Sequence, residues 1–145
     1  DEAIEDAQSM MNEGYRNSSI YGMLGYFKLL RNDDLDETTK LCEEAYDYNS
    51  DDRDIKDNLS ICYFRKGEYE KAEKISDELV VAAPNFVEGF YHGIQIAMKL
   101  NKYDKAAEYA EKLKECKRSG MTTVTEEEVN KLIQEVKNHN ENTIG

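Results

Sequence analysis

The chain has 145 residues, enough for one domain of ordinary size, and its few glycines (8) and single proline favour an all-α fold. Its net charge of −12 is concentrated early, because residues 1–52 hold 14 acidic and 4 basic side chains. We therefore expect no binding to nucleic-acid phosphates, and we interpret the acidity as a source of solubility or as a surface for a basic partner.

Residues 1–15 are predicted to form an amphipathic helix with Ala3, Ala7, Met10 and Met11 on one face. We interpret it as the second helix of a pair whose first helix is absent, so that these four side chains lack their partner. This interpretation fits a fragment of a longer protein, although a processed or tag-cleaved terminus would look the same.

The first residues of this helix begin a short acidic motif that recurs along the chain. The later copies are Asp34–Thr38, Glu68–Ala72 and Lys102–Ala106. Their last residues are 34 positions apart, and the first copy, ending at Ala3, lies 35 positions before Thr38. A fixed period of this length indicates a repeat architecture.

Each later copy follows a turn and begins a helix whose first turn is acidic, as the helix dipole favours. The turns are Asn32-Asp33, Lys66-Gly67 and Leu100-Asn101. Another amphipathic stretch precedes each turn, with apolar residues at spacings of three and four. Examples are Leu59, Cys62 and Tyr63, and then Phe90, Ile94 and Ala97. Each unit is therefore predicted to contain two antiparallel helices.

The repeat pattern is interrupted over Ser119–Val124, and a further helix is predicted after it. Thr125 and Glu128 have the spacing of a capping box. The apolar residues that follow are Val129, Leu132, Ile133 and Val136. We expect a capping helix over about 125–138, covering the last apolar face of the repeats, and a frayed tail over 140–145.

A helix-turn-helix unit of 34 residues resembles the tetratricopeptide repeat (TPR). The middle unit matches the family signature best, at Leu59, Ser60, Tyr63, Gly67, Tyr69, Ala72 and Pro84. It departs from the signature at Lys56 and Ser76, where the family commonly has aromatic residues. The flanking units are more degenerate, with Thr38 and Ile94 in small-residue slots and Ser50 and Arg118 in place of proline.

The resemblance implies an all-α, right-handed superhelix of antiparallel helix pairs, with about three TPR-like units, a leading half unit and a C-terminal capping helix. We expect a single domain over 1–139. Its parts are a half repeat at 1–17, repeats at about 18–52, 53–86 and 87–120, and the capping helix.

The first helices of TPR units line a concave groove, and the resemblance implies that a partner binds there. The corresponding residues are Tyr26, Leu30, Asp57, Ile61, Phe64, Arg65, Tyr91, Gln95, Met98 and Lys99. The aromatic and Met side chains could anchor a partner or could pack against the adjacent unit. Chaperone-tail-binding members clamp a terminal carboxylate with Lys, Arg and Asn, whereas the slots here hold Asp57, Ile61, Tyr91 and Gln95. We therefore do not expect an acidic C-terminal peptide as ligand.

No motif for catalysis, metal binding or cofactor binding is recognisable. His92 and His139 are far apart and have no ligand-like neighbours, so we expect surface or frayed side chains. Asp33–Glu37 lacks the ligand pattern of a calcium loop. The cysteines are predicted to be reduced core thiols: Cys42, Cys62 and Cys116.

The sequence therefore predicts a non-catalytic scaffold that binds a peptide or helix of another protein in its groove, with no cofactor. Two alternatives stay open. The chain could be a structural repeat segment that self-associates through its first helix, or it could be the regulatory repeat domain of a larger enzyme or regulator of which it is a fragment. No apolar run is long enough for a membrane span and no leader is recognisable, so we expect a cytoplasmic protein with no membrane partner.

Overall fold

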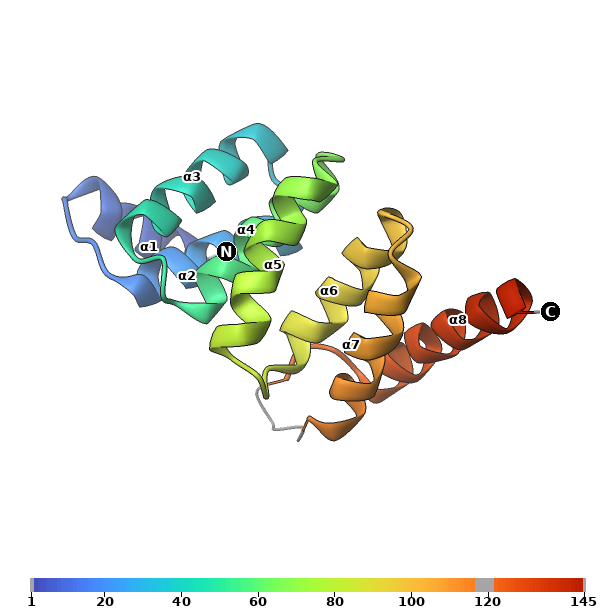
Figure 1. Ribbon diagram of the computed structural model, residues 1–145. Coiled ribbons are helices and arrows are strands. Elements are labelled where there is room, and N and C mark those ends of the chain that lie inside the picture. Colours follow the sequence, from blue (N-terminus) through green and yellow to red (C-terminus); the bar gives the residue numbers. More distant parts are fainter. Residues whose placement is uncertain (1, 117–121, 145) are drawn as a thin grey trace. The chain divides into compact units, whose positions relative to one another are not determined.

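The computed structural model describes residues 2–116 and 122–144, and this part of the chain is all-helical (Figure 1). The chain divides into two compact units, unit 1 (Asp1–Glu68) and unit 2 (Tyr69–Gly145). Unit 1 contains α1 (Glu2–Asn12), α2 (Ser18–Leu30), α3 (Leu35–Tyr48) and α4 (Arg53–Arg65). Unit 2 contains α5 (Tyr69–Ala82), α6 (Val87–Lys99), α7 (Tyr103–Glu115) and α8 (Glu126–Ile144).

The three second helices begin where the repeated motif predicts them. Helices α3, α5 and α7 start at Leu35, Tyr69 and Tyr103, each inside one copy of the motif. The turn before each helix contains one residue in the left-handed region: Asn32 (φ 55°), Gly67 (φ 79°) and Asn101 (φ 60°). Asparagine and glycine are the residues that tolerate this conformation best, so the turn chemistry repeats along with the helices.

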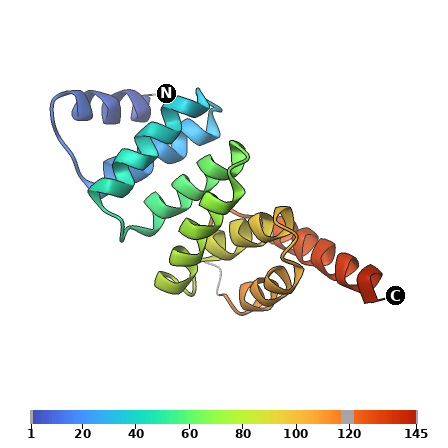
Figure 2. The ribbon, with the colours of Figure 1, turned by 45° about the horizontal axis from the view of Figure 1, so that its top comes forward.

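Unit 1 packs its four helices around one apolar core (Figure 2). The core residues come from all four helices: Ile4, Ala7, Met11, Ile20, Tyr21, Leu24, Ala45 and Ile55. Polar side chains cap the helix starts, because Asn17 accepts a hydrogen bond from the Ile20 amide (2.8 Å) and Asp52 accepts one from the Ile55 amide (3.0 Å).

The structure corrects the prediction for the inner face of α1. Ala7 and Met11 were expected to lack a partner, but both are buried in the core of unit 1 beside Ile20 and Leu24 of α2. The physical reason is that α2 covers this face of α1, as each first helix covers the preceding second helix in a repeat. Met10 remains exposed.

Unit 2 has its own core, formed mainly by α6, α7 and α8. Phe90 of α6 and Tyr109 of α7 meet edge to face, with ring centroids 5.6 Å apart. The capping box before α8 is confirmed: the Thr125 hydroxyl accepts from the Glu128 amide, and the Glu128 carboxylate accepts from the Thr125 amide. Val129, Leu132, Ile133 and Val136 then pack into the core, as predicted.

Helix α8 is longer than the sequence suggested. It continues to Ile144 instead of ending near residue 138, because no proline or glycine interrupts it before Gly145. His139 is not frayed; its ring stacks on Tyr103 of α7 at a centroid distance of 3.6 Å. The end of the third expected repeat, including Arg118, lies outside the described residues.

Candidate partner-binding surface

The two first helices of unit 1, α2 and α4, lie side by side and parallel. Asn58 donates a side-chain hydrogen bond to the Gly22 carbonyl (3.0 Å). About two turns further along both helices, Arg65 donates a hydrogen bond to the Leu29 carbonyl (3.0 Å). The Arg65 guanidinium therefore lies at the carboxyl end of α2, where the helix dipole favours a positive charge. These two bonds fix the relative position of the helices within unit 1.

Five of the predicted groove residues of unit 1 are accessible to different degrees. Tyr26 and Leu30 of α2 are exposed. On α4, Ile61 and Phe64 are half-buried and Arg65 is exposed. Unit 1 thus brings apolar and aromatic groups together with one guanidinium on two adjacent helices.

The sixth predicted groove residue of unit 1, Asp57, is buried and only 7% exposed, so its side chain is not an accessible contact. The sequence could not indicate this, because an aspartate in a helix that contains several charged residues is usually solvated. The neighbouring Asp54 is exposed, and its pKa is raised by partial burial and by the negative charges of Asp52 and Asp57. The amino end of α4 is therefore a poor place for another carboxylate.

The predicted groove residues of unit 2 all lie on α6. Tyr91 and Met98 are half-buried and pack against the core of unit 2, Gln95 is half-buried, and Lys99 is exposed. Burial raises the pKa of Tyr91, and the carboxylates of Glu128 and Glu135 on α8 raise it further. Helix α8 therefore lies beside this face of α6.

Sequence reasoning missed Met23, an exposed residue of α2. Its position could have been found, because Met23, Tyr26 and Leu30 follow the three- and four-residue spacing of a single helix face. The face contains three large apolar side chains in a row.

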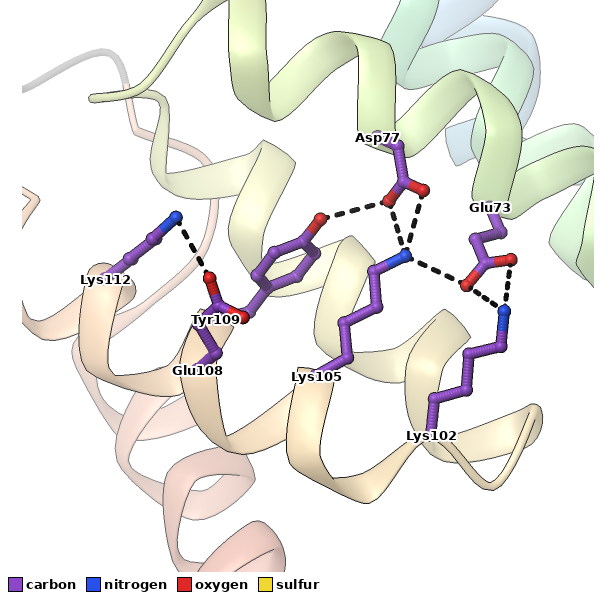
Figure 3. Close-up of polar contacts among 7 residues, drawn as sticks. All are labelled: Glu73, Asp77, Lys102, Lys105, Glu108, Tyr109 and Lys112. Carbon is purple, nitrogen blue, oxygen red and sulfur yellow. Dashed lines mark hydrogen bonds and ion pairs between the residues drawn. The ribbon is translucent and has the colours of Figure 1, made fainter.

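Ion pairs connect α5 to α7 on another surface of unit 2 (Figure 3). Glu73 binds the ammonium groups of Lys102 (2.8 Å) and Lys105 (2.9 Å), and Asp77 binds Lys105 (2.7 Å) and accepts a hydrogen bond from the Tyr109 hydroxyl (3.0 Å). Burial alone would raise the pKa of Glu73, but the hydrogen bonds and charges of the two lysines outweigh it and lower the pKa. The network is structural, because each charge is compensated by a partner.

Two of the three thiols lie together in unit 1. The sulfur atoms of Cys42 and Cys62 are 3.6 Å apart and both residues are buried. The hydrogen bond with Cys62, together with burial, raises the pKa of the Cys42 thiol.

Within residues 2–116 and 122–144, no cluster of three or more His, Cys, Asp or Glu side chains is arranged to hold a metal ion. In the same part of the chain, no helix has the length and apolar character needed to cross a membrane.

A protein-family model matches residues 29–89, and that family is the tetratricopeptide repeat. The match covers the end of α2, all of α3, α4 and α5, and the start of α6. No curated protein sequence matches the chain.

Solved structures with a similar fold are TPR proteins of low sequence identity. The Sgt2 TPR domain from Aspergillus fumigatus matches with a TM-score of 0.74 and 17% identity, over 87% of this chain and 80% of that chain. The first TPR domain of Spaghetti (RPAP3), bound to an HSP90 peptide, has a TM-score of 0.70 and 14% identity, and the match covers 84% of this chain and 91% of that chain. YrrB, a TPR protein with an unusual peptide-binding site, has a TM-score of 0.69 and 16% identity, and the match covers 93% of this chain and 64% of that chain. At these identities the likeness shows the fold alone.

Proposed function

Because the chain is a TPR-like helical repeat domain, we propose that it is a non-catalytic scaffold that binds a peptide or helix of another protein on the exposed faces of its first helices. The observation that carries this proposal is the surface of unit 1, where α2 and α4 run in parallel and present Tyr26, Leu30 and Phe64 close to Arg65. Aromatic side chains and arginine are enriched at the centres of protein interfaces.

The composition of this surface suggests how a partner would be held. Tyr26 and Leu30 offer apolar area that a partner side chain can cover, and Phe64 is half-buried, so little conformational entropy is lost when it is covered. Unit 2, taken by itself, offers Gln95 for hydrogen bonds to a partner and Lys99 as a positive charge at the end of α6.

The proposed ligand differs from the HSP90 peptide that the Spaghetti domain binds. Asp54 is exposed near the amino end of α4 and its pKa is raised by burial and by the charges of Asp52 and Asp57, so an additional carboxylate there would be repelled. The proposed partner segment therefore has no acidic side chain or terminal carboxylate at this end.

Affinity capture from a lysate of the source cell tests the proposal with three variants, each first shown by circular dichroism to remain folded. The unit 1 variant is Tyr26→Ala with Phe64→Ala, and the unit 2 variant is Tyr91→Ala with Met98→Ala. The control variant combines Tyr15→Ala with Val81→Ala, two exposed side chains outside the first helices.

We expect a protein that is captured by the native chain and the control and is reduced with one or both groove variants. Purified partner should then bind the native chain at least about 10-fold more tightly than that variant, a difference of about 1.4 kcal/mol. Equal capture by all four proteins, or no specific capture by any, would contradict binding through these helices.

A further inference from the structure

Two thiols face each other inside unit 1, where α3 packs against α4. The Cys42 sulfur, on α3, lies 3.6 Å from the Cys62 sulfur, on α4, and the two residues are 2% and 0% exposed. Gly25 of α2 is close to the same place, since a Cβ atom added to it would lie 3.2 Å from the Cys42 sulfur. We call Cys42 and Cys62 the dithiol pair; it lies where α2, α3 and α4 meet.

The distance between the two sulfur atoms suits a covalent link. A disulfide has a sulfur–sulfur length of about 2.05 Å, so atoms that start 3.6 Å apart must approach by about 1.5 Å. Shared between two side chains, this is less than about 1 Å each, which small torsional changes and a slight shift of the helices can supply. The third thiol, Cys116, belongs to unit 2, where its sulfur contacts the Lys112 carbonyl (3.4 Å).

The two sulfur atoms of the pair have different surroundings. The hydrogen bond with Cys42 lowers the pKa of the Cys62 thiol. The hydroxyl of Thr39 and the positive charge of Arg65 lower this pKa further, and burial and the carboxylate of Glu43 oppose the shift without cancelling it. The same hydrogen bond raises the pKa of Cys42, so the first proton to leave the pair comes from Cys62. Because the thiolate is the reactive form, Cys62 is the nucleophile of the pair.

Burial determines which reagents the pair can meet. Both residues are enclosed in unit 1, so a bulky oxidant has no direct access to either sulfur. Hydrogen peroxide is only slightly larger than a water molecule, so small fluctuations of the packing admit it. The surroundings therefore favour a slow reaction with a small oxidant.

We propose that Cys42 and Cys62 form a peroxide-sensitive site that is converted into an intramolecular disulfide between α3 and α4. The Cys62 thiolate attacks one oxygen of hydrogen peroxide, the O–O bond breaks, and hydroxide leaves, which gives a sulfenic acid on Cys62. The Cys42 sulfur then attacks the sulfenic sulfur, so that the S–S bond forms and the S–O bond breaks. The two hydroxides take up the two thiol protons as water, and the two electrons lost by the thiols reduce the peroxide.

The disulfide would stabilise unit 1. It joins residues 20 positions apart, and the segment between them contains the end of α3, the connecting turn and most of α4. Cross-linking this segment restricts the unfolded chain, so the oxidised form should be harder to unfold than the reduced form. A dithiol reductant reverses the reaction by thiol–disulfide exchange. The proposal does not depend on partner binding by the groove residues.

Peptide mapping of the native chain tests the proposal without any substitution. The reduced chain is treated with hydrogen peroxide, its remaining thiols are blocked with iodoacetamide in urea, and it is digested with trypsin. Trypsin cuts after Lys40, Arg53, Lys56 and Arg65, so the two cysteines fall in the separate peptides 41–53 and 57–65. We expect these peptides to be joined, at a mass lower than their sum by that of two hydrogen atoms, and to be separated by dithiothreitol.

Single substitutions, each first shown by circular dichroism to remain folded, test the order of attack. In Cys42→Ala the sulfenic acid on Cys62 cannot form a disulfide within unit 1, so it should accumulate and be trapped by dimedone. In Cys62→Ala the remaining thiol of the pair lacks the effects of Thr39 and Arg65, and trapping should be at least about 3-fold slower. Cys116→Ala is the matched control and should leave the cross-linked peptide unchanged. Equal trapping in the first two variants would contradict Cys62 as the nucleophile.

Thermal unfolding measures the effect of the disulfide on stability. The oxidised native chain should melt at least about 5 °C higher than the reduced chain, and dithiothreitol should remove the difference. Cys42→Ala contains the same methionines and cannot form the bond, so peroxide should not raise its melting temperature.

Three results would overturn the proposal. One is the absence of the joined peptides 41–53 and 57–65 under conditions in which Cys116 is oxidised. Another is a mixture of all three cysteine pairings in the native chain, as expected when the same oxidation is carried out in urea, because the folded structure would then not select the pair. The third is an oxidised native chain that melts at or below the temperature of the reduced chain.

Discussion

Gly25 occupies the closest approach among α2, α3 and α4. A Cβ atom at this position would lie 2.9 Å from the Asn58 amide nitrogen and 3.2 Å from the Cys42 sulfur. Gly25→Ala would displace the Asn58 side chain from its hydrogen bond with Gly22. We expect a loss of about 1 to 2 kcal/mol in the free energy of unfolding, measured by urea denaturation, even though alanine is the better helix former.

Gly22 provides the matched control on the same helix. A Cβ atom there would lie 3.5 Å from the Asp54 Cβ, an ordinary contact distance. Gly22→Ala should therefore be neutral or stabilise unit 1 by up to about 1 kcal/mol through helix propensity. If both substitutions destabilise the protein equally, the close approach at Gly25 is not the cause.

The sequence predicted part of this arrangement at the residue level. The TPR resemblance covers this part of α2, because Leu24 and Gly25 lie 35 positions before the matched pair Leu59 and Ser60, and Leu24 is buried as Leu59 is. It could not predict the partner of Gly25, because Asn58 precedes the Leu59–Ser60 match and is an ordinary polar residue of a helix. The burial of Asp57 was missed for the same reason: residue type does not tell which polar side chains a neighbouring helix covers.

At the level of helices, the α5–α7 ion pairs should make stability depend on pH. The pKa of Glu73 is lowered in the folded protein, so its contribution is present above the unfolded value of about 4.3 and is lost as the pH falls through the folded value. We expect Glu73→Gln to lower the free energy of unfolding at pH 7 by an amount on the order of 1 kcal/mol. The difference in the free energy of unfolding between the native protein and Glu73→Gln should shrink as the pH falls below about 4.3.

Urea titrations at several pH values measure this difference. Glu70→Gln, at an exposed carboxylate in the first turn of the same helix, is the control and should cost less than Glu73→Gln, because it removes a favourable charge at the helix dipole but no ion pair with Lys102 or Lys105. A difference between native and Glu73→Gln proteins that persists unchanged in acid would contradict the role of the Glu73 charge.

Helix starts were predictable and the last helix end was not. The 34-residue period and the acidic motif located the starts of α3, α5 and α7 because each start needs a particular turn and a favourable charge at the helix dipole. The end of α8 lacks such a marker. Gln134 donates to Asn138 at a spacing of four (2.8 Å) and His139 stacks on Tyr103, and both contacts favour continuation of the helix.

Across the whole molecule, the excess of negative charge should make stability increase with salt. Unit 1 has a net charge of −9 and unit 2 a net charge of −3. Sodium chloride between about 0.02 and 0.2 M shortens the screening length and should raise the melting temperature by reducing repulsion. A melting temperature that falls over this range would show that screening of ion pairs outweighs screening of repulsion.

Two substitutions at equivalent helix ends test where the repulsion lies. Asp47 is in the last turn of α3 in unit 1, and Glu115 is the last residue of α7 in unit 2. Asp47→Lys and Glu115→Lys change the charge equally and both suit a helix carboxyl end. Asp47→Lys should flatten the salt dependence of the melting temperature more; an equal effect of both would contradict a concentration of repulsion in unit 1.

The fold could be predicted at this scale more completely than the binding surface. The period, the turns and the small-residue slots together predicted an all-helical TPR-like chain, and the comparisons confirm it. The groove remains a prediction, because the slot of a residue in a repeat does not determine how exposed its side chain is. Tyr91 and Met98 illustrate this: their slots match the groove, yet both pack against the core of unit 2.

The unequal burial of the three cysteines makes covalent labelling a measure of local opening. Cys116 is half-buried, whereas Cys42 and Cys62 are enclosed in unit 1. A maleimide should add one label to the native chain. Its rate should rise with pH because the thiolate is the form that reacts, and burial, which raises the pKa of Cys116, should slow the reaction at neutral pH. The second and third additions, counted by intact mass, should follow the opening of unit 1, and Gly25→Ala should accelerate them while leaving the first unchanged.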